Sequence, residues 1–453
     1  MFGTTEMLIL VAVLLTLVFT GVHIAVALGT AAMLGIYLMT GDLGVVANFV
    51  GSTAYEAVRD YVFAVIPLFM LMGEFLAKCG AATDMFALIN RATRLVPGRL
   101  AVATVLSNAV FAFVTGVSIA AAAAFSKIAY PEMKRYGYDA RFSLGCISGS
   151  ACLGMLIPPS VLMIVWAILT ELSIGDLFLS GILPGFLLVF LYLLYILGAA
   201  MIHPPWVGEI SRRDAARARA AGTPSVRNDG PPLGMATVFS TLLVIGLVAG
   251  TLGGIWLGFF TPTEGAGVGA AAALLLAMSK GVRAKEIREV VLSVGRTLAP
   301  LMLLLFTAQL YSRVLTMTGF TRAAQEFLLG TGMGTWGILA LMVLTWFALG
   351  CIIDSISILL LTVPIFAPIA TALGIEPLAF AIIGIIAVET GLLTPPFGIL
   401  VFTVKAALPE ENITLSQIFT GAMPYWIALL TVIVFLAAFP EIATYLPKLF
   451  KTH

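Results

Sequence analysis

Charged residues are scarce in this sequence of 453 residues. Asp, Glu, Lys and Arg account for 10% of it, whereas 60% of the residues are apolar. Soluble chains carry roughly 25% charged residues, so this chain has too few polar groups to cover its own surface in water. Its formal net charge of +1 excludes the strong positive field with which proteins bind nucleic acids. The composition therefore predicts a membrane protein that lies in a lipid bilayer and has no nucleic-acid partner.

Side chains that perform catalysis or bind transition metals are equally few. The three histidines are scattered, and the four cysteines lie in or beside apolar runs without metal-ligand spacing. No HExxH motif is present for zinc. A serine nucleophile at Gly116-Val117-Ser118 would have no buried histidine as its base. We therefore expect no enzyme activity, no catalytic residue and no organic cofactor.

Apolar runs follow one another along the whole chain. A transmembrane helix needs about 20 apolar residues. Runs that reach or approach this length lie at 5–21, 23–40, 61–79, 141–170, 177–202, 234–257, 263–279, 290–318, 377–405 and 417–440. Two further stretches, 100–128 and 335–371, exceed a single span and are interrupted near their middle by small or polar residues. The pattern predicts an all-α polytopic membrane protein.

Basic residues gather in four segments, namely 91–99, 127–141, 203–231 and 280–288. The positive-inside rule places all four in the cytoplasm. Segment 203–231 is the only long polar stretch, and it divides the chain into two halves. We expect a cytoplasmic loop there, with a short surface helix in its part rich in Arg and Ala.

The two halves resemble each other. Pro158-Pro159 recurs as Pro395-Pro396, a shift of 237 residues (395 − 158). Further pairs at the same shift are Gly154 and Gly391, Gly137 and Gly374, Pro131 and Pro368, Ser118 and Ser355, and Asp139 and Glu376. Lys and Arg flank the turn at Gly137, but only an acidic residue lies near Gly374, which places the two turns on opposite sides of the membrane. Inverted repeats of this kind are typical of secondary transporters, whose sites lie at the repeat interface.

Four polar interruptions break the apolar runs, two in each half, at 115–118, 148–160, 351–357 and 389–398. A Pro-Pro pair cannot continue an α-helix, and the carbonyls it frees must face protein or a watery cavity. Freed carbonyls and hydroxyls suit a hard cation such as Na⁺, while opened helix N-termini favour a carboxylate. The interruptions therefore favour a sodium-coupled transporter of a small anion.

Individual polar residues within these runs are candidates for ion or solute contacts. Asp354 is the sharpest, because a carboxylate inside an apolar run is costly; it could balance Na⁺, carry a coupling proton, or form a structural hydrogen bond to the next loop. Glu389 could face a cavity or have a structural role. Arg313 could attract the carboxylate of the solute or extend to the membrane surface. Ser118 and Ser150 are further candidates for solute contact.

Several stretches resemble the large membrane subunit of tripartite ATP-independent periplasmic (TRAP) transporters. They are the segment 96–160, which runs from VPGRLAVATVLSN to CLGMLIPPS, and the motifs GFFTPTEGAGVGA, LGCIIDSISILLLTVPIFAPIA and ETGLLTPPFGILVF. The resemblance implies an inverted-repeat, elevator-type ion-transporter fold, in which two re-entrant helical hairpins and two broken helices move on a scaffold. Residues 100–128 would form the inward-opening hairpin and 335–371 the outward-opening one.

The resemblance also implies a division of the chain. Residues 1–99 would form scaffold helices and a cytoplasmic amphipathic segment, and residues 100–176 would form a first transport repeat. Residues 177–318 would form further scaffold helices with the loop 203–231. A second transport repeat would follow at 319–405, and a C-terminal scaffold helix at 406–453. The implied protein is a multi-pass subunit of the bacterial inner membrane. It would import a small carboxylate with Na⁺ as the coupling ion, together with a small TRAP membrane subunit and a periplasmic solute-binding protein.

Sodium sites in this family lie between each hairpin tip and the broken helix of the same repeat. Carried onto this sequence, the implied residues are Thr115, Gly116, Ser118, Gly154, Pro158 and Ser160 in the first repeat, and Asp354, Ser357, Thr390, Gly391 and Thr394 in the second. The first tip often reads Gly-Ser-Ser in the family. Here it is Gly116-Val117-Ser118, which has one hydroxyl fewer.

Three other functions remain to be weighed. The first is a stand-alone carboxylate symporter of the same broad fold, coupled to sodium or protons, which needs no binding protein. The second is an intramembrane enzyme, which the lack of a base for a serine nucleophile disfavours. The third is a channel, whose selectivity filter usually needs an oligomeric ring that nothing in the sequence indicates.

Overall fold

The computed structural model describes residues 4–208 and 234–451, and every regular element in these ranges is a helix. The first half contains α1 (Thr4–Phe19), α2 (Ile24–Thr40), α3 (Leu43–Arg59), η1 (Tyr61–Ala64), α4 (Val65–Lys78), α5 (Ala81–Ala92), α6 (Arg99–Thr115), α7 (Ser118–Arg135), α8 (Ala140–Ala151), α9 (Leu153–Leu156), α10 (Val161–Thr170), α11 (Ile174–Ile202) and η2 (Pro204–Trp206). The second half contains α13 (Met235–Trp256), α14 (Pro262–Ser279), α15 (Ala284–Thr318), α16 (Phe320–Gly330), α17 (Gly334–Gly350), α18 (Ser355–Ala372), α19 (Pro377–Gly391), α20 (Ile399–Ala407), α21 (Leu415–Ala438) and α22 (Glu441–Lys451).

Seven helical segments of the described part are long and apolar enough to cross a membrane. They are Tyr61–Lys78, Ala140–Thr170, Ile174–Ile202, Thr237–Trp256, Ala284–Thr318, Ser355–Ala372 and Leu415–Ala438. Five shorter apolar helices accompany them, among them α2, α6 and α17. The helical content and these spans confirm the prediction of an all-α polytopic membrane protein. Most of the predicted loop 203–231, including its predicted surface helix, lies outside the described residues.

All four predicted interruptions coincide with helix ends. The first over-long stretch turns at Gly116, between α6 and α7, and the second turns at 351–354, between α17 and α18. The Pro-Pro pairs lie between α9 and α10 and between α19 and α20, where both Pro-Pro peptide bonds are cis. Since proline removes an amide donor and clashes with the preceding turn, the helices end at these positions. The chain therefore has two helical pairs and two broken helices, one of each per half.

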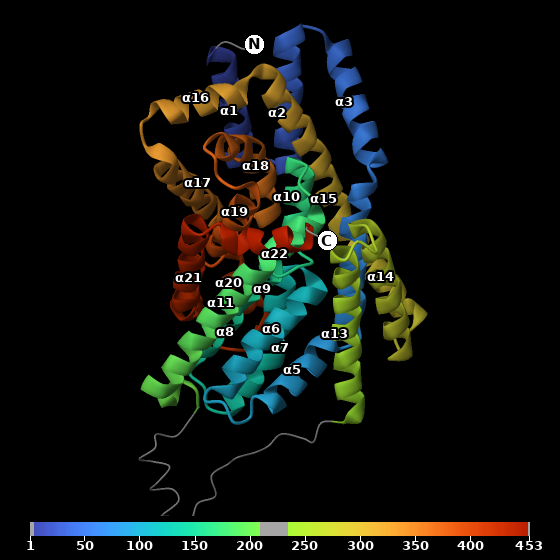
Figure 1. The fold of residues 1–453 in the computed structure, drawn as a ribbon, viewed down its shortest axis with the longest axis vertical. Coiled ribbons are helices and arrows are strands. Elements are labelled where there is room, and N and C mark those ends of the chain that lie inside the picture. Colours follow the sequence, from blue (N-terminus) through green and yellow to red (C-terminus); the bar gives the residue numbers. More distant parts are fainter. Residues whose placement is uncertain (1–3, 209–233, 452–453) are drawn as a thin grey trace, which may run out of the picture.

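The repeat extends far beyond the sequence matches, which span only residues 118–159. Shifted by 237 residues, α7 becomes 355–372 (118 + 237 and 135 + 237), the bounds of α18. Likewise α2 shifts to 261–277, close to α14, and α5 shifts to 318–329, close to α16. The counterparts α5 and α16 lie at opposite ends of the molecule (Figure 1), as inverted repeats require.

Equivalent caps begin the broken helices of the two repeats. The Oδ1 atom of Asp139 accepts a hydrogen bond from the amide of Phe142 (3.0 Å) at the start of α8. Its counterpart Glu376 accepts one from the amide of Ala379 (2.8 Å) at the start of α19. The match between Asp139 and Glu376 in the sequence therefore reflects a shared capping role.

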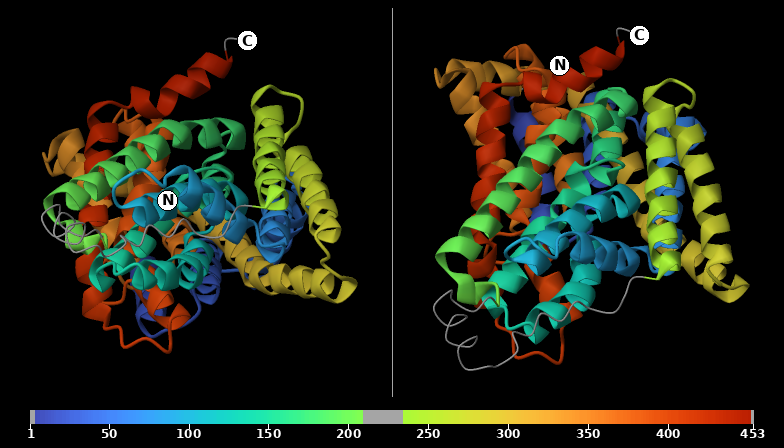
Figure 2. Two further views of the ribbon diagram at one scale, coloured as in Figure 1. Left: turned by 90° about the horizontal axis from the view of Figure 1, so that it is seen from below. Right: turned by 60° about the horizontal axis from the view of Figure 1, so that its bottom comes forward.

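The helices form two groups. Helices α1 to α4 pack with α13, α14 and α15, and the helical pairs and broken helices pack with α11 and α21. Among the helices that the resemblance assigns to the scaffold, α21 packs mainly on α8 and α19, and α11 packs mainly on α22 and α21. Helices α13 and α14 lie on one side of the molecule and α11 and α21 on the opposite side (Figure 1). The region 406–453 contains two helices instead of the expected one, because α21 ends at Ala438 and the chain then forms α22, which packs on α11 (Figure 2).

Contacts between the basic segments place them at one end of the molecule, as the charge pattern predicts. The amide of Leu100 donates to the hydroxyl of Tyr138 (3.2 Å), and the amide of Asp139 donates to the carbonyl of Trp206 (3.0 Å). Asp84 and Lys280 form an ion pair (2.5 Å). These contacts join the regions around 91–99, 127–141, 203–208 and 280.

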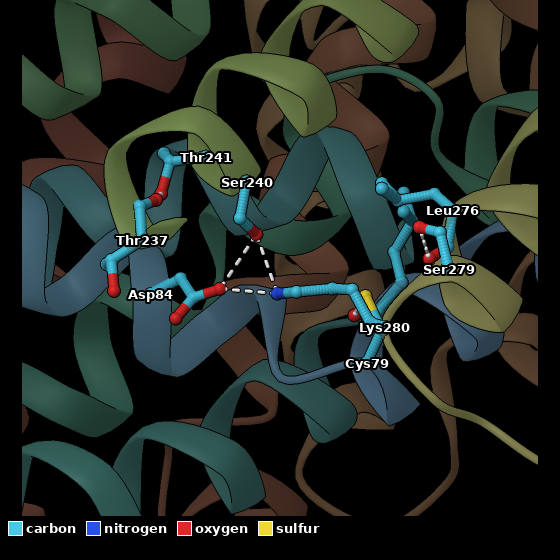
Figure 3. Close-up of polar contacts among 9 residues, drawn as sticks. Cys79, Asp84, Thr237, Ser240, Thr241, Leu276, Ser279 and Lys280 are labelled. Carbon is cyan, nitrogen blue, oxygen red and sulfur yellow. Dashed lines mark hydrogen bonds and ion pairs between the residues drawn. The ribbon is translucent and has the colours of Figure 1, made fainter. Parts of the chain in front are cut away.

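A polar cluster at this end joins α5 to α13 and α14 (Figure 3). Lys280 Nζ donates to Asp84 Oδ2 (2.5 Å) and to Ser240 Oγ (2.6 Å), and Ser240 Oγ donates to the same carboxylate oxygen (2.7 Å). Asp84 and Lys280 have side chains that are only 23% and 25% exposed. Since α5 leads directly into α6, the cluster ties the start of the first helical pair to the other helix group.

Replacing Asp84 with Asn should lower the thermal unfolding midpoint of the purified protein, because the half-buried Lys280 loses its counter-ion. Hydrogen bonds to charged groups contribute about 1.5–3 kcal/mol, and partial exposure reduces this to about 1 kcal/mol here. Glu289→Gln is the matched control, since the Lys78–Glu289 pair is exposed and should contribute little. Equal midpoints for the two variants would show that the cluster does not stabilise the fold.

Candidate functional site

The turn between α6 and α7, which we call the first tip (115–118), packs directly on the first Pro-Pro break. Gly116 has φ +60°, and its carbonyl accepts a hydrogen bond from the amide of Val161 (3.3 Å). A Cβ atom at Gly116 would lie 2.3 Å from the carbonyl oxygen of Pro159. A Cβ at Gly154 would lie 3.1 Å from the backbone of Ser118. The structure therefore brings the predicted first-site residues together.

Most hydroxyl groups around the first tip are already hydrogen-bonded. Ser160 Oγ donates to the carbonyl of Met155 (2.5 Å) and accepts from the amide of Met163 (3.4 Å), which caps α10. Thr115 Oγ1 donates to the carbonyl of Phe111 (3.3 Å). The hydroxyl of Ser118 is fully buried and has no hydrogen-bond partner within the described ranges. Of the three hydroxyl groups of Thr115, Ser118 and Ser160, that of Ser118 is therefore available to bind a ligand.

The turn between α17 and α18, which we call the second tip (351–354), is more open. Asp354 is exposed, and its Oδ1 atom caps α18 by accepting from the amide of Ser357 (3.0 Å). Gly391 packs so closely on α17 that a Cβ there would lie 2.7 Å from the Cα atom of Gly350. Thr390 Oγ1 donates to the carbonyl of Ile386 (2.6 Å), and Thr394 Oγ1 donates to that of Thr390 (2.9 Å).

The two breaks differ in their exposure. Residues 157–160 at the first break, including Pro158, are all buried. At the second break Pro395 and Pro396 are exposed, as are Phe397 (55%) and Ile352 (57%) beside it. The first tip is thus closed on its break, whereas the second tip and its break face the surroundings.

Glu389 lies where the two repeats meet. It is 1% exposed, and its Oε1 atom accepts a hydrogen bond from Ser355 Oγ (3.2 Å), the first residue of α18. The hydroxyl of Ser118, the first residue of α7, lies near the same carboxyl group. The repeat counterpart of Glu389 is Cys152 (152 + 237 = 389), whose Sγ atom contacts the backbone carbonyl of Glu389 (3.8 Å). Glu389 therefore lies beside the pseudo-twofold axis, near the equivalent serines that begin α7 and α18.

Two predicted solute contacts lie in other surroundings. Ser150 is buried, accepts from Asn108 Nδ2 (2.6 Å) and donates to the carbonyl of Cys146 (2.6 Å), so it joins α8 to α6. Arg313 pairs with Glu56 and donates to Thr53 Oγ1 (3.3 Å), which joins α15 to α3 in the other helix group. Its charge is therefore already balanced by a carboxylate away from both tips.

The described residues contain no cluster of three or more His, Cys, Asp or Glu side chains that could hold a metal ion. The oxygen atoms at the tips and breaks are instead hydroxyls, backbone carbonyls and isolated carboxylates. These are ligands for hard cations.

The sequence of the chain matches, over residues 11–442, the family model of the tripartite ATP-independent periplasmic transporter, DctM component. The chain belongs to the DctM family. It is accordingly a TRAP transporter large permease subunit and a multi-pass protein of the bacterial inner membrane, as the sequence motifs predicted.

Curated DctM-family relatives are similar over nearly their whole length. The C4-dicarboxylate TRAP transporter large permease protein DctM of Pseudomonas aeruginosa is 32% identical and covers 93% of this chain and 94% of its own length. The ectoine TRAP transporter large permease protein TeaC of Halomonas elongata is 26% identical, and the match covers 97% of this chain and 99% of the relative. The sialic acid TRAP transporter large permease protein SiaM of Vibrio cholerae is 26% identical, with 96% and 97% covered. These three relatives are named as permeases and not as enzymes.

Solved structures support the fold of this DctM-family chain. The YdaH transporter of Alcanivorax borkumensis is similar with a TM-score of 0.64 at 14% identity, covering 89% of this chain and 90% of that one. MtrF of Neisseria gonorrhoeae, described as an antimetabolite efflux pump, has a TM-score of 0.57 at 12% identity and covers 89% and 86%. At such low sequence identity, this similarity shows a shared fold and nothing about function.

One residue that the structure places beside the candidate Glu389 was not itself a candidate. Ser355 contacts Glu389, but it was noticed only as the repeat match of Ser118. Its position could have been inferred from that match, because symmetry-related residues that begin α7 and α18 must lie at equivalent places around the repeat interface.

Proposed function

We propose that this chain is the sodium-coupled large permease subunit of a TRAP transporter that imports a small carboxylate. A periplasmic solute-binding protein would deliver the solute, and a small TRAP membrane subunit would complete the membrane complex. The observation that carries the proposal is the pairing of each tip with the Pro-Pro break of its own repeat. Family membership favours this tripartite system over a stand-alone symporter.

Sodium fits the oxygen atoms at the two tips. In the first repeat they are the unpartnered hydroxyl of Ser118 and the carbonyls around Gly154 to Ser160. In the second repeat they are the exposed carboxylate of Asp354, of which Oδ1 is used by the cap, and the carbonyls of the break around Thr394. Bound Na⁺ would supply positive charge at the tips, where it would offset the charge of an anionic solute.

The two helix groups support an elevator movement. The group that contains both tips and both breaks is joined to the other group through α5 and α16, which precede α6 and α17 in equivalent positions of the repeat. Movement of the first group against the second would carry both tips and both breaks across the membrane. The relatives named above transport C4-dicarboxylates, ectoine or sialic acid, so the binding protein and not the permease fold would select the solute.

Uptake should require both Na⁺ and the binding protein. The test reconstitutes this chain with its small subunit in proteoliposomes and adds the cognate binding protein loaded with labelled carboxylate. We expect uptake with an inward Na⁺ gradient and less than a tenth of it with choline. Equal uptake without the binding protein would favour the stand-alone symporter, and indifference to Na⁺ would favour protons as the coupling ion.

Asp354→Asn should reduce Na⁺-driven uptake at least tenfold while the fold is retained. Asn caps helices as well as Asp does, so the start of α18 is preserved and only the charge is lost. The matched control is Asp139→Asn, which removes the charge from the equivalent kind of cap on α8, away from both tips. Similar uptake by the two variants would remove Asp354 from the sodium site.

A further inference from the structure

The carboxyl group of Glu389 is buried beside the pseudo-twofold axis of the repeat, and its charge has no protein counter-ion in the described chain. Ser355 donates one hydrogen bond to Oε1, while Oε2 has no partner among the described residues. Two titratable groups interact electrostatically with Glu389, the thiol of Cys152 between α8 and α9 and the phenol of Tyr192 on α11, and neither is a cation. The Tyr192 hydroxyl donates to the carbonyl of Gly149 (3.2 Å) and does not bind the carboxylate.

A buried carboxylate without a partner is costly, and carboxylates within membrane helices commonly serve ions or protons. The N-termini of α7 and α18 favour a negative charge, but such dipole interactions offset only part of the cost of burying an ion. A cation is therefore needed if Glu389 is to remain ionised. The unpartnered oxygens around it, Glu389 Oε2 and Ser118 Oγ, are hard ligands of the kind that alkali and alkaline-earth cations prefer.

We propose that Glu389, Ser118 and Ser355 form an additional Na⁺ site beside the pseudo-twofold axis, between the N-termini of α7 and α18. It differs from the two sites between each tip and its own break, because its ligands come from both repeats: Ser118, which it shares with the first-tip site, belongs to the first repeat, and Ser355 and Glu389 belong to the second. The inference rests on the proposed sodium coupling. Its consequence is that one ion ties α7 and α18 together, since an outward displacement of either helix removes a serine from the site.

The test counts bound sodium ions without measuring transport. The full chain with its small subunit, in lipid nanodiscs, is unfolded thermally at increasing NaCl with choline chloride keeping the ionic strength constant. A ligand that binds only the folded state raises the free energy of unfolding by RT ln(1 + [L]/Kd). At saturating Na⁺ concentrations, the slope of the free energy of unfolding against the logarithm of the Na⁺ concentration therefore gives the number of ions bound. Glu389→Gln keeps the size of the side chain and should reduce this number by one. Ser355→Ala should raise the half-saturating Na⁺ concentration of one ion about tenfold, as expected for the loss of a ligand worth about 1.4 kcal/mol.

The matched control is Glu376→Gln, the same substitution on the same helix at its capped end, which should leave the slope unchanged. If Glu389→Gln does not fold, Ser355→Ala decides alone. If Glu389→Gln leaves the slope unchanged and Ser355→Ala leaves the half-saturating Na⁺ concentration unchanged, the additional Na⁺ site is overturned while sodium coupling stands. A parent that is stabilised equally by sodium and choline would overturn the sodium coupling and the additional site together.

Discussion

Replacing Gly116 with Ala should abolish Na⁺-dependent uptake. Gly116 has φ +60°, a backbone conformation that costs other residues about 1–2 kcal/mol. In addition, the new Cβ would lie 2.3 Å from the carbonyl oxygen of Pro159, which is backbone and cannot rotate away. Relief of this clash requires the first tip to move off its break, at a further cost of about 1–3 kcal/mol. Uptake in proteoliposomes should fall at least tenfold, and the thermal unfolding midpoint should fall with it.

Gly137→Ala separates the two causes. Gly137 also has positive φ (+73°), but a Cβ there would meet no atom within 4 Å. It should therefore show the backbone cost without the clash and retain most of its uptake. If the two variants transport equally well, contact between the first tip and the first break is not needed for transport.

Gly421→Ala should prevent recovery of folded protein. Helices α8 and α21 touch backbone to backbone: a Cβ at Gly421 would lie 2.0 Å from the carbonyl oxygen of Arg141, and a Cβ at Gly145 would lie 2.0 Å from that of Gly421. Small residues allow such close approach between membrane helices. A methyl group would push the helices apart by more than an ångström along a fully buried face of α8, at a cost of about 3 kcal/mol or more.

The control for this variant is Gly246→Ala on α13, where a Cβ would meet nothing within 4 Å. It should elute as a single peak in size-exclusion chromatography with an unchanged unfolding midpoint. Gly421→Ala should instead aggregate on the column, and any protein that elutes as a folded species should have a thermal unfolding midpoint many degrees lower. An unchanged midpoint for Gly421→Ala would mean that α8 and α21 are not in backbone contact.

The helix ends and the repeat could be predicted because they depend on local chemistry. Pro-Pro pairs end helices wherever they occur, and glycine permits the sharp turn at Gly116. Acidic residues cap helices at equivalent places in both halves. These signals remain readable in a chain whose apolar residues are otherwise interchangeable, and so the tips, the breaks and the offset of 237 residues were all accessible from the sequence.

Packing partners were less accessible, because apolar helices in lipid carry no polar face that indicates their neighbours. The contacts of α21 with α8 and α19, and of α11 with α22 and α21, could not be inferred from their apolar sequences. For Arg313, solute contact and extension to the membrane surface both stayed open in the sequence, because its partner Glu56 lies 257 residues away. The burial of Glu389 between serines of both halves likewise depends on how the repeats meet. Helices α3, α16 and α22 were missed because their apolar residues do not form a long run.

The unequal breaks imply what the other end state of the molecule looks like. Two copies of one architecture occupy different arrangements here: Pro158 is buried under its tip, whereas Pro395 and Pro396 are exposed. In a protein of inverted repeats, exchanging the arrangements of the two copies produces the conformation that opens to the opposite compartment. A cysteine at position 395 should therefore react with a water-soluble thiol reagent in the state described here and be shielded in the alternate state, while a cysteine at 158 should show the reverse accessibility.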